Sequence, residues 1–278
     1  MERGAVFITG ANSGIGKATA ERLARAGFTV IPGVRNPDSL TEPVKDPVTI
    51  DLADADSVGP ACEQVLDRAG GRLVGLVNNA GISLSGPFET LPLAEWRRQF
   101  EVNVFGQLAV TQALLPALLS SRGRIVNIGS IGGRYASPFL GPYNASKFAV
   151  RAWSDSLRVE LAPHGVHVAL VEPGSIDTPL WGKGFSHADA EVERLTDEQR
   201  ARYERQIGGA RKVAEFAAAH GIPPDKVAKV VEHALSSARP KGRYLVGADA
   251  HMQAGVAVLP TRAMDRVTRL LLRQPGRA

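Results

Sequence analysis

Short apolar runs alternate with longer amphipathic stretches along most of this sequence. Runs rich in β-branched and other apolar residues, such as 5–9, 29–34 and 124–128, predict buried strands. Stretches with apolar residues at steps of three and four, such as 54–69 and 141–161, predict helices. Because strands and helices alternate, the pattern predicts an α/β protein with a parallel sheet.

The same periodicity continues through the chain, with one exception. We expect strands over residues 5–9, 29–34, 48–52, 73–77, 124–128, 166–171 and 242–246. We expect helices over residues 15–27, 54–69, 141–161, 223–237 and 259–272, with one or two more within 93–119. The exception is 178–221, which is irregular, then charged and partly helical, and too long for an ordinary loop.

Three glycines occupy the turn between the first strand and the first helix. Residues 10–16 read Gly-Ala-Asn-Ser-Gly-Ile-Gly. Glycine lets backbone N–H groups approach a pyrophosphate closely, and the positive end of the following helix points at that charge. At this junction, the spacing Gly-x-x-x-Gly-x-Gly predicts nucleotide binding. The alternative is a tight turn that uses glycine only for its shape.

The end of the second strand indicates which dinucleotide binds. An acidic side chain there binds a ribose 2′-hydroxyl and repels a 2′-phosphate. This sequence has no carboxylate at that position, and Arg35 offers a planar cation suited to a phosphate. We therefore expect NADP(H) rather than NAD(H), against the alternative that Arg35 is only an exposed loop charge.

Polar residues also follow the other strands. Asp51 ends the third strand, where it is placed to accept a hydrogen bond from adenine. Residues 78–81 (Asn-Asn-Ala-Gly) end the fourth strand and Ser130 follows the fifth, at the edge where open α/β sheets bind ligands. Asn103 lies among apolar residues of a predicted helix, and the pattern fits a structural amide and a functional one equally well.

Tyr143 and Lys147 lie four residues apart at the start of the helix predicted over 141–161. They therefore share one helix face, which brings the ammonium close to the phenol. A neighbouring cation favours the phenolate, so we expect Lys147 to lower the pKa of Tyr143 toward the range of a useful acid or base. The spacing alone is a weak signal and needs its structural context.

Composition narrows the function classes. The 278 residues carry a formal net charge of +5, but the basic residues are dispersed among 28 acidic ones, which argues against a nucleic-acid partner. The one cysteine, Cys62, cannot form an intramolecular disulfide. We find no signal peptide and no apolar stretch of about 20 residues, so we expect a cytoplasmic protein. The histidines show no metal-binding pattern, and we expect no metal site.

Taken together, these motifs resemble the short-chain dehydrogenase/reductase (SDR) family over roughly residues 4–180. The matching segments occur in the family's order: residues 9–16, residues 78–81, Asn103, Ser130, Tyr143-x-x-x-Lys147 and Pro173-Gly174. The resemblance implies a doubly wound, seven-stranded parallel Rossmann sheet with helices on both faces. The sequence looks most similar to the retinol, 17β-hydroxysteroid and hydroxybutyrate dehydrogenase branch.

The resemblance also implies roles for individual residues. The catalytic set is Asn103, Ser130, Tyr143 and Lys147, with Tyr143 as the acid/base. The dinucleotide contacts are Gly10, Ser13, Gly14, Ile15, Gly16, Arg35, Asp51, Leu52, Asn79, Ala80, Gly81, Tyr143, Lys147, Pro173, Gly174, Ile176 and Thr178. Lys147 holds the ribose, Ser130 orients the carbonyl oxygen, and Asn103 positions a water.

We expect one Rossmann-type domain over residues 1–278. Its parts are a dinucleotide-binding and catalytic core (1–178), a helical lid (179–221), a last helix and strand (222–247) and a C-terminal helical tail (248–278). The apolar residues of the lid are interleaved with charges, which favours closure over a bulky apolar substrate. The alternative is a helical excursion that packs on the domain or on another subunit.

The tail lacks the glycine-rich segment with which many family members build tetramers. We therefore expect a homodimer, formed through the helices that carry Asn103 and Tyr143, and leave a tetramer open. The basic amphipathic helix at the end of the chain permits contact with a membrane surface, which we do not favour.

The predicted activity is NADP(H)-dependent hydride transfer to or from a secondary alcohol, ketone or aldehyde. The substrate we expect is bulky and apolar, like a hydroxysteroid or retinol. Two alternatives remain open: an SDR lyase or epimerase that uses the same Tyr–Lys pair, and a non-catalytic NADP-binding sensor or scaffold. The short C-terminal region argues against the first, and the complete catalytic set argues against the second.

Overall fold

The computed structural model describes residues 3–40 and 45–272. Within these residues, seven parallel strands form one sheet in the order β3-β2-β1-β4-β5-β6-β7. The strands are β1 (Ala5–Thr9), β2 (Thr29–Val34), β3 (Val48–Thr49), β4 (Leu73–Asn78), β5 (Arg124–Ile128), β6 (His167–Pro173) and β7 (Arg243–Val246). The strand order reverses between β1 and β4, where open α/β sheets bind their ligands. This doubly wound sheet confirms the predicted fold class.

The third strand is shorter than its apolar pattern predicted. Strand β3 ends at Thr49, not at residue 52. The Ile50 N–H still donates to the carbonyl of Val34 (2.9 Å), but the next carboxylate, Asp51, accepts the N–H of Ala53 and turns the chain away. The prediction was wrong at this end because a local side-chain hydrogen bond competes with strand pairing.

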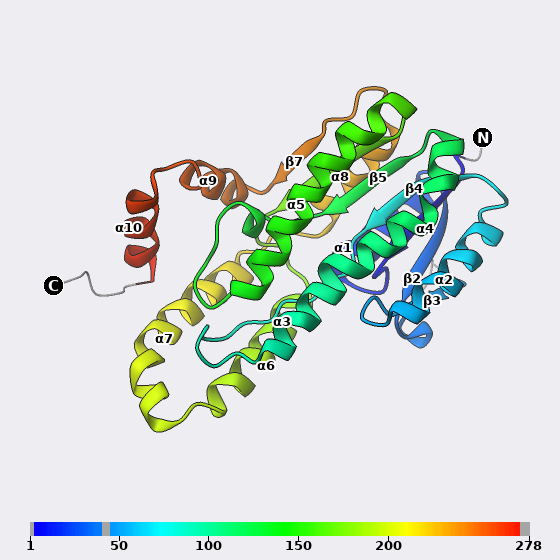
Figure 1. The fold of residues 1–278 in the computed structure, drawn as a ribbon. Helices are drawn as coiled ribbons and strands as arrows, with labels where there is room; N and C mark the ends of the chain where they lie inside the picture. The colour runs from blue at the N-terminus through cyan, green and yellow to red at the C-terminus, as the bar shows by residue number, and fades with distance from the viewer. Residues whose placement is uncertain (1–2, 41–44, 273–278) are drawn as a thin grey trace.

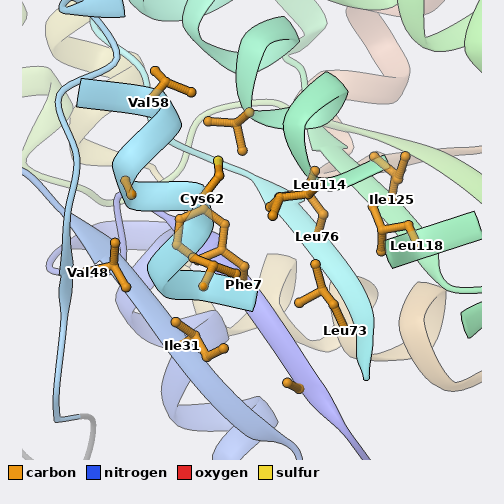
Figure 2. Close-up of a cluster of buried hydrophobic side chains, with 14 of the residues drawn as sticks. Phe7, Ile31, Val48, Val58, Cys62, Leu73, Leu76, Leu114, Leu118 and Ile125 are labelled. Carbon is orange, nitrogen blue, oxygen red and sulfur yellow. The ribbon is translucent and has the colours of Figure 1, made fainter. Parts of the chain in front are cut away.

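Helices cover both faces of the sheet (Figure 1). They are α1 (Gly14–Arg25), α2 (Ala55–Arg68), α3 (Leu93–Phe100), α4 (Gly106–Ser121), α5 (Gly141–Leu161), α6 (Leu180–Glu193), α7 (Asp197–Ala219), α8 (Asp225–Ser236), α9 (Ala248–Val256) and α10 (Thr261–Leu271). Alternation along β1 separates two cores: Val6 and Ile8 pack with α1 and α8, whereas Ala5 and Phe7 pack with α2 and α4. Figure 2 shows the second core, where Cys62 is a buried packing residue between α2 and the sheet.

A continuous helical run of 29 residues, Leu93–Ser121, joins α3 to α4 through one π-helical turn at Glu101–Phe105. By length and composition it is the one segment of the described chain that could cross a membrane, which corrects the expectation that no segment could. This is weak support for a span, because α4 places Val110, Leu114 and Leu118 in the core against the sheet. A core helix of a soluble domain meets the same criteria.

The C-terminal third differs most from the sequence prediction. Helices α6 and α7 fill the region predicted to be partly helical, and Figure 1 shows them beyond the ends of β4 and β5. Helix α9 was not predicted, because its nine residues follow a glycine and show little amphipathic pattern. Helix α10 lies within the predicted 259–272. Its Thr268 bonds to the hydroxyl of Tyr135 (2.5 Å), which follows the Ser130 turn.

Candidate active site

The glycine turn between β1 and α1 brings bare backbone to the carboxyl edge of the sheet. Gly10 and Gly14 have φ values of +68° and +51°, which side chains disfavour, and a Cβ on Gly16 would collide with the carbonyl oxygen of Gly10. Ser13 precedes α1 without capping it through its side chain, and the first turn of α1 has no acidic residue. The N-terminal N–H groups of α1 therefore suit a pyrophosphate, and this turn fits a dinucleotide.

Asn79 fixes the turn after β4 against the glycine turn. Its side-chain amide donates to the carbonyls of Thr9 (2.9 Å) and Gly10 (3.1 Å). The Thr9 hydroxyl accepts the N–H groups of Asn79 and Ala80, both at 3.0 Å. These bonds hold the ends of β1 and β4 together at the switch point, so Asn79 acts here through the backbone that it positions.

The remaining predicted dinucleotide contacts lie around this turn. Arg35 is exposed after β2 and forms no hydrogen bond or ion pair with any residue in the described ranges. The methyl group of Thr178 lies 2.9 Å from a Cβ built on Gly14, so the segment after β6 returns to the glycine turn. That segment contains the buried Pro173 and Ile176, with Gly174 and Thr178 half-buried. Asp51 and Leu52 follow β3, where Leu52 packs against Gly106.

Lys147 is buried on α5, and its ammonium donates to the carbonyl of Ile128 at the end of β5 (2.8 Å). Burial lowers the pKa of Lys147 to about 8, because a charged group loses hydration there. Its Nζ lies 5.9 Å from the ring centroid of Tyr143, as the four-residue spacing predicted. Because its pKa of about 8 lies above 7, most Lys147 side chains are still protonated at neutral pH.

Asn103 lies in the π-helical turn and faces the loop after β4. Its Oδ1 accepts the N–H of Ile82 (2.9 Å), and its Nδ2 donates to the Ile82 carbonyl (3.0 Å) and to Ser146 Oγ (3.1 Å). A Cβ built on Gly81 would lie 3.2 Å from this Oδ1 and 3.9 Å from Lys147 Nζ. Asn103 and Lys147 thus face the same point above Gly81, a geometry suited to a water between them.

Ser130 and Tyr143 meet at Gly132, whose hypothetical Cβ lies 3.3 Å from both Ser130 Oγ and the Tyr143 ring. Burial raises the pKa of the Tyr143 phenol, and a hydrogen bond with Ser130 opposes that shift. The expected downward shift of the Tyr143 pKa by Lys147 is therefore wrong for the chain as described. Burial of the ring is the larger cause, and the hydrogen bond with Ser130 offsets only part of it.

Sequence reasoning missed three residues that build the site. The buried Gln99 bonds to Leu84 N–H (2.8 Å) and the Ile82 carbonyl (2.7 Å), and Gln107 donates to the Ala80 carbonyl (2.7 Å). Both are buried amides on the same helical run as Asn103, so the signal that identified Asn103 applies equally to them. Asp249 accepts the N–H of Ser175 (2.6 Å), a long-range contact without a local sequence signal.

Polar contacts at the surface join the lid (residues 179–221) to the rest of the domain. Glu89, in the loop after β4, accepts hydrogen bonds from Arg202 and from the Tyr203 hydroxyl of α7, both at 2.7 Å. Within the lid, Arg211 pairs with Asp189 (2.5 Å) and lies over the ring of Phe185. In the ranges that the structure describes, no group of three or more acidic, histidine or cysteine side chains could hold a metal ion.

Residues 4–189 match the short chain dehydrogenase family. The chain is 36% identical to the NADPH-dependent 3-dehydrocapnine reductase of Ornithobacterium rhinotracheale, over 94% of each chain. It is 34% identical to retinol dehydrogenase 5 of Mus musculus, over 98% of this chain and 90% of that one. It is similar in fold to a short chain dehydrogenase from Burkholderia cenocepacia in complex with NADP, with a TM-score of 0.72, 28% identity and 99% coverage of both chains. With its matched family region extending over more than half of the sequence, this chain belongs to the short-chain dehydrogenases, a family of oxidoreductases.

Proposed function

We propose that this protein is an NADP(H)-dependent carbonyl reductase or alcohol dehydrogenase for bulky apolar substrates, with Tyr143 as its acid/base. The observation that carries the proposal is the convergence of Ser130, Tyr143 and Lys147 at the carboxyl edge of the sheet, beside a glycine turn that fits a dinucleotide. This arrangement supplies an acid, an oxygen-binding hydroxyl and a nearby cation at one point.

The proposed mechanism divides the reaction between cofactor and protein. NADP(H), when bound, supplies or accepts the hydride. Tyr143 donates its phenolic proton to the carbonyl oxygen in reduction, and Ser130 hydrogen-bonds that oxygen as negative charge develops. Lys147 holds the ribose hydroxyls and stabilises the phenolate that remains. Asn103 positions a water that returns the proton to Tyr143 through Lys147.

Arg35 supports the preference for NADP(H). It is exposed after β2, forms no ion pair with the described residues, and follows Gly33, whose carbonyl accepts the N–H of Gly10 (2.8 Å). Arg35 therefore follows a strand whose end is hydrogen-bonded to the glycine turn, and its exposed side chain is available for a 2′-phosphate. The NADPH-dependent relative from Ornithobacterium rhinotracheale supports the same choice.

The lid supports an apolar substrate. Aromatic pairs join Trp181 to Phe185 within α6, and Phe139 of the loop before α5 to Tyr203 of α7. The Phe139–Tyr203 pair offers apolar surface at the loop that leads into α5, the helix that carries Tyr143, which suits a large ketone or alcohol. The relative named for retinol fits this size and polarity.

We also propose that the enzyme works in the cytoplasm as a homodimer, formed through α4 and α5. Phe148 and Val159 of α5 and Phe105, which directly precedes α4, are exposed apolar residues on the elements expected to form that contact. Light scattering of the purified protein tests the dimer, and a monomeric mass at all concentrations would exclude it.

The activity is tested by following NADPH consumption with ketones and aldehydes graded from short aliphatic to steroid and retinoid, with NADH in parallel. We expect turnover of the large apolar substrates with NADPH and little with NADH. Activity with NADH alone would contradict the role of Arg35. Tight NADPH binding without turnover of any carbonyl would favour a sensor, or a lyase or epimerase, over a reductase.

A further inference from the structure

A cavity of about 320 Å³ opens beside the edge strand β7, apart from the candidate active site. Its lining consists of Arg134, Lys241, Arg243, Tyr244, Leu245 and His251. None of these residues belongs to the predicted catalytic or dinucleotide set. Three of the six are cations, one is a histidine, and none is acidic, so the cavity wall is strongly basic.

Nearby carboxylates neutralise only part of this charge. The carboxylate of Glu172, which is buried on β6, accepts hydrogen bonds from Nε and Nη2 of Arg134 (2.7 and 2.5 Å). Asp155 on α5 pairs with Arg243 and also accepts from Arg158 (2.6 Å). Two carboxylates therefore form ion pairs with three arginines.

Two further cations have no carboxylate partner. Lys241 forms no ion pair with any residue that the structure describes. Arg151 reaches only the Gly133 carbonyl (3.4 Å). Burial lowers the pKa of Arg151, the charges of Arg134 and Arg243 lower it further, and the charges of Glu172 and Asp155 oppose this shift in part. A partly buried cation such as Arg151, repelled by neighbouring arginines, gains stability from an anion placed beside it.

We propose that this cavity binds a phosphate group, either as free phosphate or as part of a small phosphate ester. Arginine forks and a lysine ammonium are the side chains that most favour phosphate oxygens. The volume lies at the lower end of small-ligand pockets, so it accommodates a phosphate with a modest organic group.

A second cavity of about 120 Å³ supports the ester form. It shares Lys241 with the first, and its lining includes the apolar Val166, Val168 and Ala169 together with Arg158 and His167. A phosphate held by Lys241 and Arg243 would therefore leave room for an apolar substituent along the same edge of the sheet.

The test is calorimetric titration of the full-length protein, saturated with NADP⁺ so that the dinucleotide site is filled. Inorganic phosphate and phenyl phosphate are titrated separately. We expect saturable binding with a dissociation constant below about 10 mM, corresponding to more than about 2.7 kcal/mol. Tighter binding of phenyl phosphate would identify an ester as the ligand, and equal binding would identify free phosphate.

Lys241→Ala provides the decisive variant because Lys241 is exposed and has no ion pair to lose among the described residues. It should weaken phosphate binding about tenfold, the loss expected for one charge-assisted contact. The matched control is Lys229→Ala on the exposed face of α8, which should bind as the wild type does.

Absence of saturable binding by the wild type would overturn the proposal, as would equal binding by the wild type and Lys241→Ala. Light scattering of Lys241→Glu adds an independent outcome. If the wild type binds no phosphate and this variant dissociates from dimer to monomer, the basic edge is an interface between two copies of the chain, and the phosphate site is excluded.

Discussion

The part of the molecule that would hold the dinucleotide and the part that would hold the substrate are stabilised in different ways. Helix α4, which packs on the sheet, buries six residues, among them Val110 and Leu114. Helix α7 of the lid is fully described and buries none, and its links to the domain are contacts such as Glu89 with Arg202. Burial contributes far more to stability than exposed ion pairs do.

This contrast assigns different physical tasks to the two parts. The scaffold places Lys147 and Asn103 through buried hydrogen bonds, so their positions are fixed before a ligand arrives. Helix α7 of the lid is held mainly by solvent-exposed contacts, which open at little cost, as the proposed entry of a bulky substrate requires. Mutations in the scaffold should therefore affect chemistry, whereas mutations in the lid should affect substrate affinity.

The largest effect is expected for Tyr143→Phe, which keeps the ring and removes the proton donor. Turnover should fall by at least about 10²-fold, while NADPH affinity and thermal stability change little. The matched control is Tyr203→Phe, which removes a hydroxyl from the lid. Near-normal turnover in Tyr143→Phe would show that another group protonates the substrate.

Arg35→Ala tests cofactor selection by the scaffold. It should raise the KM for NADPH about tenfold or more and leave the KM for NADH unchanged, because only the first has a 2′-phosphate. Arg72→Ala, an exposed arginine at the opposite end of the sheet, serves as the control. Equal losses with both cofactors would mean that Arg35 does not read the 2′-phosphate.

The pH dependence of reduction tests Lys147. Its pKa of about 8 predicts that the rate falls above that pH, by about tenfold per unit where the ammonium is required. Lys147→Arg keeps the cation and should move this decline to higher pH. A rate that stays constant from pH 7 to 10 in the wild type would exclude a required Lys147 ammonium.

The same pKa predicts a stability effect of defined sign. Between about pH 8 and the ordinary lysine pKa of 10.5, the unfolded chain binds a proton that the folded chain has lost, so stability should rise with pH in this window. Chemical denaturation at several pH values measures it, with Lys147→Met as the variant that lacks this contribution.

The smallest effect is expected in the lid. Glu89→Gln weakens the contact with Arg202 and Tyr203 and should raise the KM for a bulky ketone by about two- to threefold, with an unchanged KM for NADPH. Glu198→Gln, which loses only a contact within α7, is the control. An equal rise in the KM for the ketone and in the KM for NADPH would mean that the lid has a structural role only.

Features of the structure that depend on local sequence patterns were predicted, whereas features that depend on contacts between distant parts of the chain were not. Strand β1 and helix α5 match their predicted bounds because burial and helix periodicity are local patterns. The raised pKa of Tyr143 could not be predicted, because it depends on burial by distant segments. The basic cavity likewise joins Arg134 to Lys241 and His251, which are far apart in the sequence.

The most direct test of the central claim is to follow deuterium from NADPH labelled at C4 of the nicotinamide, in both epimers, into the product of a bulky ketone by mass spectrometry. We predict that one epimer places deuterium on the carbinol carbon and that Tyr143→Phe forms almost no labelled alcohol. Tight binding of NADPH with no labelled product from either epimer, across the whole range of carbonyl compounds, would contradict hydride transfer by this protein.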